Sequence, residues 1–155
     1  MEFITKIQEP EQAAKTVHSW QDIGFEVVFT NGCFDLLHTG HIYYLYASRQ
    51  LGNKLIVAIN DDDSVRRLKG PSRPVNTRED RALLLAALEF VDLVTWFAED
   101  TPLELIQRIL PDILTKGGDY SVENIVGAEI VIDHGGAVLS LPFVEGYSTT
   151  NILNK

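Results

Sequence analysis

The sequence predicts an α/β protein built on a mainly five-stranded parallel sheet with helices on both faces. Short apolar segments of strand length alternate along the chain with segments of helical spacing. The strand segments are almost uniformly apolar, which is typical of parallel strands buried on both faces. Several of the expected helices end at a glycine, and no internal repeat or low-complexity tract interrupts the pattern. These observations together favour a single wound sheet.

The expected strands are short, and each follows a helix or a turn signal. In chain order they cover residues 26–30, 54–60, 91–97, 112–118 and 137–142. The first helix, 10–23, has apolar residues at helical spacing and a glycine stop. Three later helices are expected at 42–52, 64–68 and 123–136. Another follows the N-cap Thr77, and another begins with Thr101 as N-cap and Pro102 as N1. A last, short helix follows the segment "GYSTTN". Residues 69–76 contain both proline and glycine and are expected to form a loop.

Length and composition indicate one globular domain. A chain of 155 residues with 45% apolar and 23% charged residues suits one core without a linker. We therefore expect a single domain over residues 1–155, with the N-terminal helix 10–23 as an appendage. The first twelve residues contain acids and no long apolar stretch, so neither a secretion signal nor a membrane span is expected.

Charge and cysteine content exclude further classes. With the single cysteine Cys33 no internal disulfide can form, and a cytoplasmic location is the default. The formal net charge of −9 argues against a nucleic-acid-binding surface, which needs clustered lysine and arginine. A small anionic ligand still fits if the few cations gather in one place.

The loop "NGCFDLLHTGH" (31–41) connects the first strand to the next helix. In open parallel sheets, ligands bind beyond the carboxyl ends of the strands, where such loops lie. Asn31 and Gly32 permit a tight turn, and the helix N-terminus offers unpaired N–H groups. If Thr39 caps the helix, His38 and His41 lie around its first turn and can present their imidazoles to one anion. The loop therefore predicts a phosphate site.

Other interpretations of this loop stay open. A histidine pair is a common pattern and carries little weight alone. A metal site would need a third ligand, for which Asp35 is the nearest candidate, yet no His/Cys cluster accompanies it. Asp35 bonding to the backbone is the simpler alternative. A dinucleotide site lacks its G-x-G-x-x-G after the first strand, and Cys33 as a nucleophile lacks a fixed partner.

The segment "TNGCFDLLHTGH" (30–41) resembles the H-x-G-H signature of the cytidylyltransferase-like nucleotidyltransferases, a Rossmann-like, doubly wound α/β family. Five later segments resemble the members of this family that adenylylate heptose 1-phosphate: "RLKGPSRPVN", "EFVDLV", "EDTPLELI", "ILPDILTKGGDY" and "EGYSTTNIL". The resemblance covers nearly the whole chain from about residue 25 onward, and the combination is more specific than the histidine motif. The sugar kinase joined to this domain in bifunctional relatives is missing, so a stand-alone enzyme with a separate kinase is expected.

The resemblance implies a transfer of AMP from ATP to a heptose 1-phosphate, giving ADP-heptose for bacterial surface glycans. The attacking phosphate oxygen is already an anion, so the protein mainly positions two charged molecules and stabilises equatorial charge. Mg²⁺ accompanying ATP is the implied cofactor, and no protein ligand for it is identified. We expect the acids 61–63 to be a solvated helix start rather than a metal site.

The residues and the resemblance together indicate which side chains form the candidate site. The candidate catalytic groups are His38, His41 and Lys116, which ends an apolar strand at the ligand edge. The candidate nucleotide-binding residues are Asn31, Gly32, Cys33, Phe34, Gly40, Gly118, Asp119, Ser148, Thr149 and Thr150. The candidate phosphate- and substrate-binding residues are Asp35, Lys69, Arg73 and Arg81. Of these, Lys69 and Arg73 lie on the Pro/Gly loop, which can close over a ligand.

Two alternative functions are also considered. A cytidylyltransferase acting on a small polyol phosphate is disfavoured because Glu89 stands where those relatives carry an arginine. A non-catalytic nucleotide-binding module that regulates a partner would release no pyrophosphate.

The stretch "EFVDLVTWF" (89–97) predicts an apolar surface near the sheet edge. It places there Val91, Leu93, Val94, Trp96 and Phe97, which is more apolar surface than a small domain covers. Because relatives commonly dimerise nearby, a two-fold homodimer is expected, unless the aromatics pack under the neighbouring helix.

Overall fold

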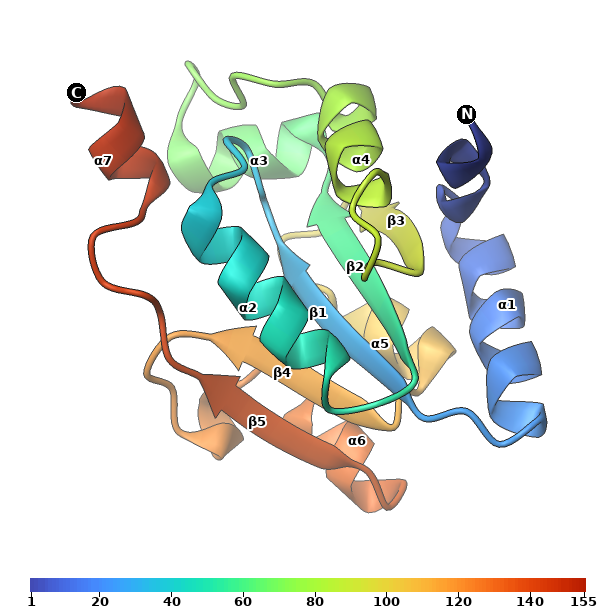
Figure 1. Ribbon diagram of the computed structural model, residues 1–155. Helices are drawn as coiled ribbons and strands as arrows, with labels where there is room; N and C mark the ends of the chain where they lie inside the picture. Colours follow the sequence, from blue (N-terminus) through green and yellow to red (C-terminus); the bar gives the residue numbers. More distant parts are fainter.

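The computed structural model describes all residues, 1–155, and contains one sheet of five parallel strands (Figure 1). The strands are β1 (Val27–Gly32), β2 (Lys54–Asn60), β3 (Leu93–Phe97), β4 (Ile113–Gly117) and β5 (Ala137–Leu141). They lie in the order β3-β2-β1-β4-β5, and every neighbouring pair is parallel. The chain winds from β1 to one edge and then returns to the other side of β1. The strand order therefore reverses between β1 and β4, whose carboxyl ends form the crevice where ligands of such sheets bind.

Helices cover both faces of this sheet, as the predicted fold class requires. One layer contains α1 (Pro10–Asp22), α5 (Leu103–Ile109) and α6 (Ala128–Asp133), and the other contains α2 (Thr39–Arg49) and α4 (Arg78–Ala86). The remaining helices are short: η1 (Glu2–Lys6), α3 (Asp62–Lys69), η2 (Val122–Asn124) and α7 (Thr149–Leu153). None of the helices combines the length and apolar character needed to cross a bilayer.

Helix α1 is part of the core rather than the appendage that we expected. Ala13 and Val17 are fully buried and pack with residues of β1, β3 and α5. The ring Nε2 of His18 lies 3.0 Å from the Ile109 carbonyl at the end of α5. The apolar spacing of this helix was visible in the sequence, but the end of α5, to which it hydrogen-bonds, lies about 90 residues away.

Most apolar residues of the stretch 89–97 are buried inside the chain, and Trp96 is half-buried. At most 4% of the surface is exposed at Val91, Leu93, Val94 and Phe97. The N-terminal segment covers the outer edge of β3, where the Gln8 N–H donates to the Val94 carbonyl at 2.9 Å. The Arg78 guanidinium lies 4.3 Å from the Trp96 ring centroid. The apolar patch that motivated a homodimer is therefore absent here, and the dimer stays a prediction without this support.

Three local expectations can be compared with the structure. Thr77 caps α4 as predicted, because its hydroxyl accepts the Asp80 N–H at 3.2 Å. Helix α5 starts later than expected, with Pro102 as the N-cap and no capping bond from Thr101. The helix expected over 123–136 is broken into η2 and α6 by Gly127, whose φ of 86° is in the left-handed region that favours glycine.

Candidate active site

A cavity of about 490 Å³ opens at the carboxyl ends of β1, β2 and β4. Its walls come from the loop after β1, the start of α2, the end of α3 with the following loop, the β3–α5 turn, the segment after β4 and the C-terminal segment. The predicted site residues that line it are Asn31, Gly32, Cys33, Phe34, Asp35, His41, Lys69, Arg73, Lys116 and Thr149. The reversal of strand order thus gathers residues from across the whole chain into one hollow.

The two histidines do not occupy equivalent places. His41 lines the cavity, whereas His38 is the N-cap of α2 and lies behind it. The rings stack, with centroids 3.7 Å apart and planes 19° from parallel. The backbone N–H of His38 donates to Nδ1 of His41 at 3.3 Å. Because Nδ1 accepts this bond, the proton of the neutral imidazole lies on Nε2, which is then a donor available to a ligand.

Both histidines are neutral at pH 7 in the free protein. Burial, assisted by the stacked His38 and by Lys69, lowers the pKa of His41 to about 4. Burial also lowers the pKa of His38 below its ordinary value. The sequence left open whether these side chains are cations or neutral, and burial favours the neutral form of both in the free protein.

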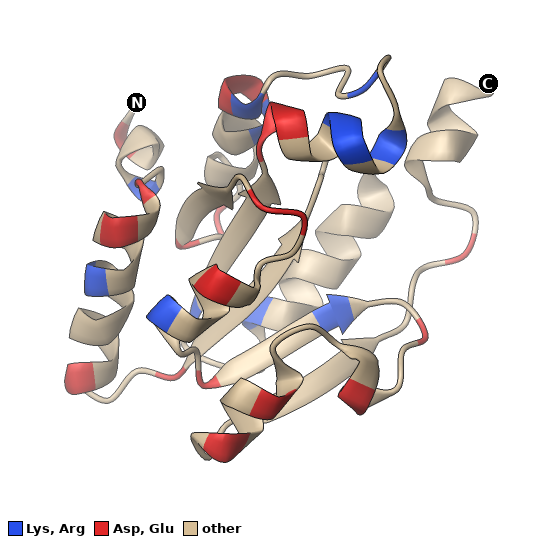
Figure 2. Ribbon diagram, turned by 180° about the vertical axis from the view of Figure 1, so that it is seen from behind, with Lys and Arg blue, Asp and Glu red and all other residues tan.

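The cations of the cavity come from three separate elements. Lys116 is the penultimate residue of β4, where burial lowers the pKa of its ammonium group, and its Nζ lies 5.8 Å from the Tyr120 ring centroid. Lys69 is the last residue of α3, a helix with acids in its first turn and basic residues in its last (Figure 2). Arg73 follows on the loop, and its buried Nη2 has no partner. A chain with a net charge of −9 therefore still offers three cations to one ligand.

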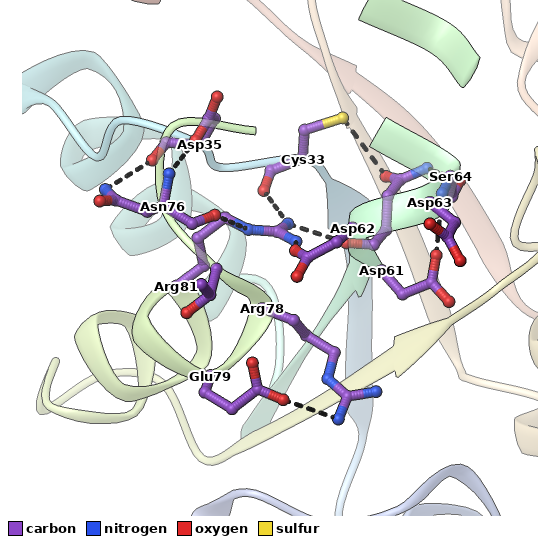
Figure 3. A network of polar contacts seen from close by, with 12 residues as sticks. Cys33, Asp35, Asp61, Asp62, Asp63, Ser64, Asn76, Arg78, Glu79 and Arg81 are labelled. Atoms are coloured by element: carbon purple, nitrogen blue, oxygen red, sulfur yellow. Dashed lines mark hydrogen bonds and ion pairs between the residues drawn. The ribbon is translucent and has the colours of Figure 1, made fainter. Parts of the chain in front are cut away.

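Arg81 was expected to bind phosphate, but it is fully buried and does not line the cavity. Its Nη1 donates to the carbonyl oxygens of Cys33 at 2.7 Å and Asn60 at 2.8 Å. Its Nε donates to the Asn76 carbonyl at 3.1 Å, and its Nη2 pairs with Asp62 at 2.7 Å (Figure 3). Arg81 therefore ties the ends of β1 and β2 to the start of α4. The acids 61–63 form the start of α3 as expected and Asp63 is exposed, but the pairing with Arg81 means that Asp62 is not simply solvated.

Asp35 lines the cavity, but its carboxylate is engaged by other groups of the protein. Its carboxylate is almost fully buried and accepts the backbone N–H groups of Val75 and Asn76 at 2.9 Å. Arg73 Nε donates to the same carboxylate at 2.6 Å. Burial would raise the pKa of Asp35, but these hydrogen bonds lower it, so the group stays charged. Asp35 thus anchors the Pro/Gly loop, which is the simpler of the two roles considered for it.

Comparison with known proteins agrees with this geometry. Residues 29–155 match the cytidylyltransferase-like family. The chain belongs to this family. It is 52% identical over 151 residues to the bifunctional protein HldE of Trichlorobacter lovleyi, covering 97% of this chain and 31% of that protein. The HldE of Hahella chejuensis is 56% identical over 132 residues, covering 85% and 28%. The chain thus spans about a third of the length of these curated relatives.

Solved structures extend the comparison. The lipopolysaccharide core biosynthesis protein from Thermoplasma volcanium GSS1 aligns with a TM-score of 0.62 and 30% identity, covering 81% of this chain and 100% of that one. The pantoate-beta-alanine ligase from Francisella tularensis reaches the same TM-score at 14% identity, covering 95% of this chain and 75% of that one. The second likeness shows the fold alone. The predicted family and Rossmann-like fold class are confirmed.

Several residues expected at the site of this cytidylyltransferase-like chain do not line the cavity: His38, Gly40, Arg81, Gly118, Asp119, Ser148 and Thr150. Gly117 lines the wall in place of Gly118, and Asp119 is exposed beyond it. Ser148 caps α7 by accepting the Asn151 N–H at 2.9 Å, which leaves Thr149 as the hydroxyl facing the cavity. The motif was located correctly, but its individual side chains depend on the local turn.

Sequence reasoning missed other lining residues, for which two signals existed. Tyr44 follows His41 by three residues, so helical spacing places both on one face of α2. Asn60 ends β2 at the ligand edge, where Lys116 is the penultimate residue of β4. Asp100 and Thr101 follow β3 at the same edge. Phe143 had no signal, because its place over the Gly117 backbone depends on the path taken after β5.

The lowered pKa of His41 predicts a loss of stability in acid. Between its ordinary pKa of 6.5 and about 4, the unfolded chain binds a proton here that the folded chain does not. The free energy of unfolding therefore falls as pH drops through this window, by about 2 kcal/mol for a partly exposed ring. Urea unfolding at neutral pH and at about pH 4.5 should show this loss in the wild type and a smaller one in His41→Gln. Equal losses in the two proteins would contradict the prediction.

Proposed function

We propose that this chain transfers AMP from ATP to a heptose 1-phosphate, producing ADP-heptose and pyrophosphate for surface glycans of the lipopolysaccharide type. The observation that carries the proposal is that His41 and Lys116 line one cavity at the switch point of a cytidylyltransferase-like fold. The resemblance of five segments to heptose 1-phosphate adenylyltransferases supports the choice of sugar. The solved relative from Thermoplasma volcanium GSS1 is named for lipopolysaccharide core biosynthesis, which agrees with that choice.

The residues suit an in-line displacement at the α-phosphorus. An oxygen of the sugar phosphate attacks, the bond to the leaving pyrophosphate breaks, and no strong base is needed because the nucleophile is already ionised. In this proposal the neutral Nε2–H of His41 donates to a phosphate oxygen, and the backbone N–H groups of the loop after β1 assist it. Lys116, Lys69 and the unpaired Nη2 of Arg73 offset the charge that the two substrates bring together.

The magnesium ion of this reaction belongs with the nucleotide. No group of three or more His, Cys, Asp and Glu side chains that could hold a metal ion occurs in the structure. The two carboxylates that line the cavity, Asp35 and Asp100, are each engaged by an arginine. We therefore propose that Mg²⁺ enters as MgATP, held by phosphate oxygens, and that it neutralises the leaving pyrophosphate.

The same proposal includes the organisation of the protein. We propose that residues 1–155 act as one nucleotidyltransferase domain, which uses heptose 1-phosphate made by a heptose kinase activity. A cytoplasmic location, where ATP is available, and a two-fold homodimer remain predictions from the sequence. Light scattering at micromolar concentration measures the mass that decides between monomer and dimer.

A substrate panel tests the activity. Purified protein is incubated with MgATP, MgCTP, MgGTP or MgUTP and with heptose 1-phosphate, mannose 1-phosphate or glycerol 3-phosphate. Pyrophosphate release is followed, and the products are identified by mass spectrometry. We expect ADP-heptose from ATP and heptose 1-phosphate. A preference for CTP and glycerol 3-phosphate would instead identify a polyol cytidylyltransferase, and nucleotide binding without pyrophosphate release would identify a regulatory module.

Replacing Lys116 by alanine is expected to lower kcat/KM by roughly 10- to 100-fold, because a hydrogen bond to a charged group contributes about 1.5–3 kcal/mol. Lys116→Arg keeps the charge and should recover part of the activity. Lys15→Ala, on the exposed face of α1, is the matched control and should keep the wild-type rate. Wild-type kinetics in Lys116→Ala over a range of salt concentrations would reduce Lys116 to a surface charge.

A further inference from the structure

The turn between β3 and α5 brings polar side chains to the cavity. Asp100 and Thr101 line the cavity there, and Asn124 of η2 lines it as well. These residues add a carboxylate, a hydroxyl and an amide to a lining that also contains Lys69 and Lys116. The cavity therefore combines hydrogen-bond acceptors with cations.

Asp100 is unsuited to contact a phosphate group. Asp35, the other carboxylate of the cavity, is buried and consumed by two backbone N–H groups and Arg73. The Asp100 side chain is 67% exposed. A carboxylate only accepts hydrogen bonds and repels phosphate, so the part of a ligand that lies beside it must donate. In a phosphorylated substrate, the available donors are hydroxyl groups.

Hydrogen bonds orient two of these side chains and leave an acceptor oxygen free on each of them. Arg67 Nε donates to Oδ1 of Asp100 at 2.8 Å and its Nη2 donates to the Ala98 carbonyl at 2.6 Å, which orients the carboxylate and leaves Oδ2 free. The Thr101 hydroxyl makes no hydrogen bond and does not cap α5. Asn124 Nδ2 donates to Ser121 Oγ at 2.7 Å, which leaves its side-chain carbonyl as an acceptor.

We propose that Asp100, together with Thr101 and Asn124, binds hydroxyl groups of the sugar and so selects a polyhydroxylated glycosyl phosphate over a small phosphate. This inference rests on the proposed function and names the residues that give it substrate specificity. The phosphate of the same molecule is bound by the cations of the cavity. Arg67 acts as a positioning residue, because it holds Asp100 without lining the cavity itself.

The direction in which Asp100→Asn changes the KM for heptose 1-phosphate tests the proposal. If Asp100 were only a negative charge near an anionic substrate, Asp100→Asn would remove a repulsion and lower the KM for heptose 1-phosphate. If it binds hydroxyls, losing the charged acceptor should raise that KM by about tenfold or more and leave the KM for ATP unchanged. Inhibition by inorganic phosphate, which has no sugar hydroxyls, should not weaken in the variant.

Two variants serve as controls. Asp63→Asn removes another exposed aspartate that pairs with an arginine, on α3 and away from the cavity, and should behave as wild type. Arg67→Gln breaks the same ion pair but keeps the Asp100 carboxylate, so its KM for the sugar phosphate should rise far less than that of Asp100→Asn. A rise of equal size in Arg67→Gln would mean that the ion pair, not hydroxyl binding, matters.

Calorimetric titration of the wild type with heptose 1-phosphate separates the two proposals. If the wild type binds and adenylylates the sugar phosphate while Asp100→Asn has an equal or lower KM, the hydroxyl-binding role is overturned and the proposed function stands. If the wild type neither binds a sugar 1-phosphate nor transfers AMP to it, the proposed function falls and this role falls with it.

Discussion

Replacing His41 by alanine is expected to lower kcat of nucleotidyl transfer by about a hundredfold or more, the usual loss when one donor to developing charge is removed. The neutral Nε2–H lies in a partly buried site, where such a donor acts with little competition from water. Steady-state pyrophosphate release measures the loss, and circular dichroism checks that the variant is folded. His134→Ala, at the exposed end of α6, is the matched control and should keep the wild-type rate.

His38→Ala should cost less than His41→Ala. His38 does not line the cavity, and it supports His41 through ring stacking and through its backbone N–H, which alanine retains. An equal loss in the two variants would give His38 a direct contact with substrate. Wild-type turnover in His41→Ala would remove the histidine motif from the mechanism altogether.

Replacing Arg81 by alanine is expected to lower the free energy of unfolding by about 3–5 kcal/mol, the usual cost of breaking a buried ion pair. The change leaves the Asp62 carboxylate without its arginine and the carbonyl groups of Cys33, Asn60 and Asn76 without their donor. Urea unfolding followed by circular dichroism measures the loss.

The control lies one helical turn earlier on α4. Arg78 packs on the Trp96 ring and pairs with Glu79 at the surface, so Arg78→Ala should cost only about 1 kcal/mol. If Arg81→Ala unfolds at the same urea concentration as the wild type but has lost activity, Arg81 would act on the substrate, as the sequence first suggested, and the anchoring role would be wrong.

The fold class and the sheet edge expected to bind a ligand both follow from local patterns in the sequence. Uniformly apolar strands alternating with helices require a parallel sheet buried on both faces, and parallel strands present their carboxyl ends at one edge. The histidine motif after β1 and Lys116 at the end of β4 therefore had to lie near each other. Both inferences use local periodicity and a rule of topology, which need no side-chain detail.

Only the tertiary structure decided what each polar side chain does within that site. Arg81 and Lys69 are both basic residues near a Pro/Gly loop. Arg81 is buried and donates hydrogen bonds to four acceptors, whereas Lys69 lines the cavity. In the same way, α1 was expected to be an appendage and the stretch 89–97 an apolar patch at the sheet edge, and apolar residues of both belong to the core. The reason is physical: burial and hydrogen-bond partners come from segments distant along the chain, and a sequence pattern records only its own neighbourhood.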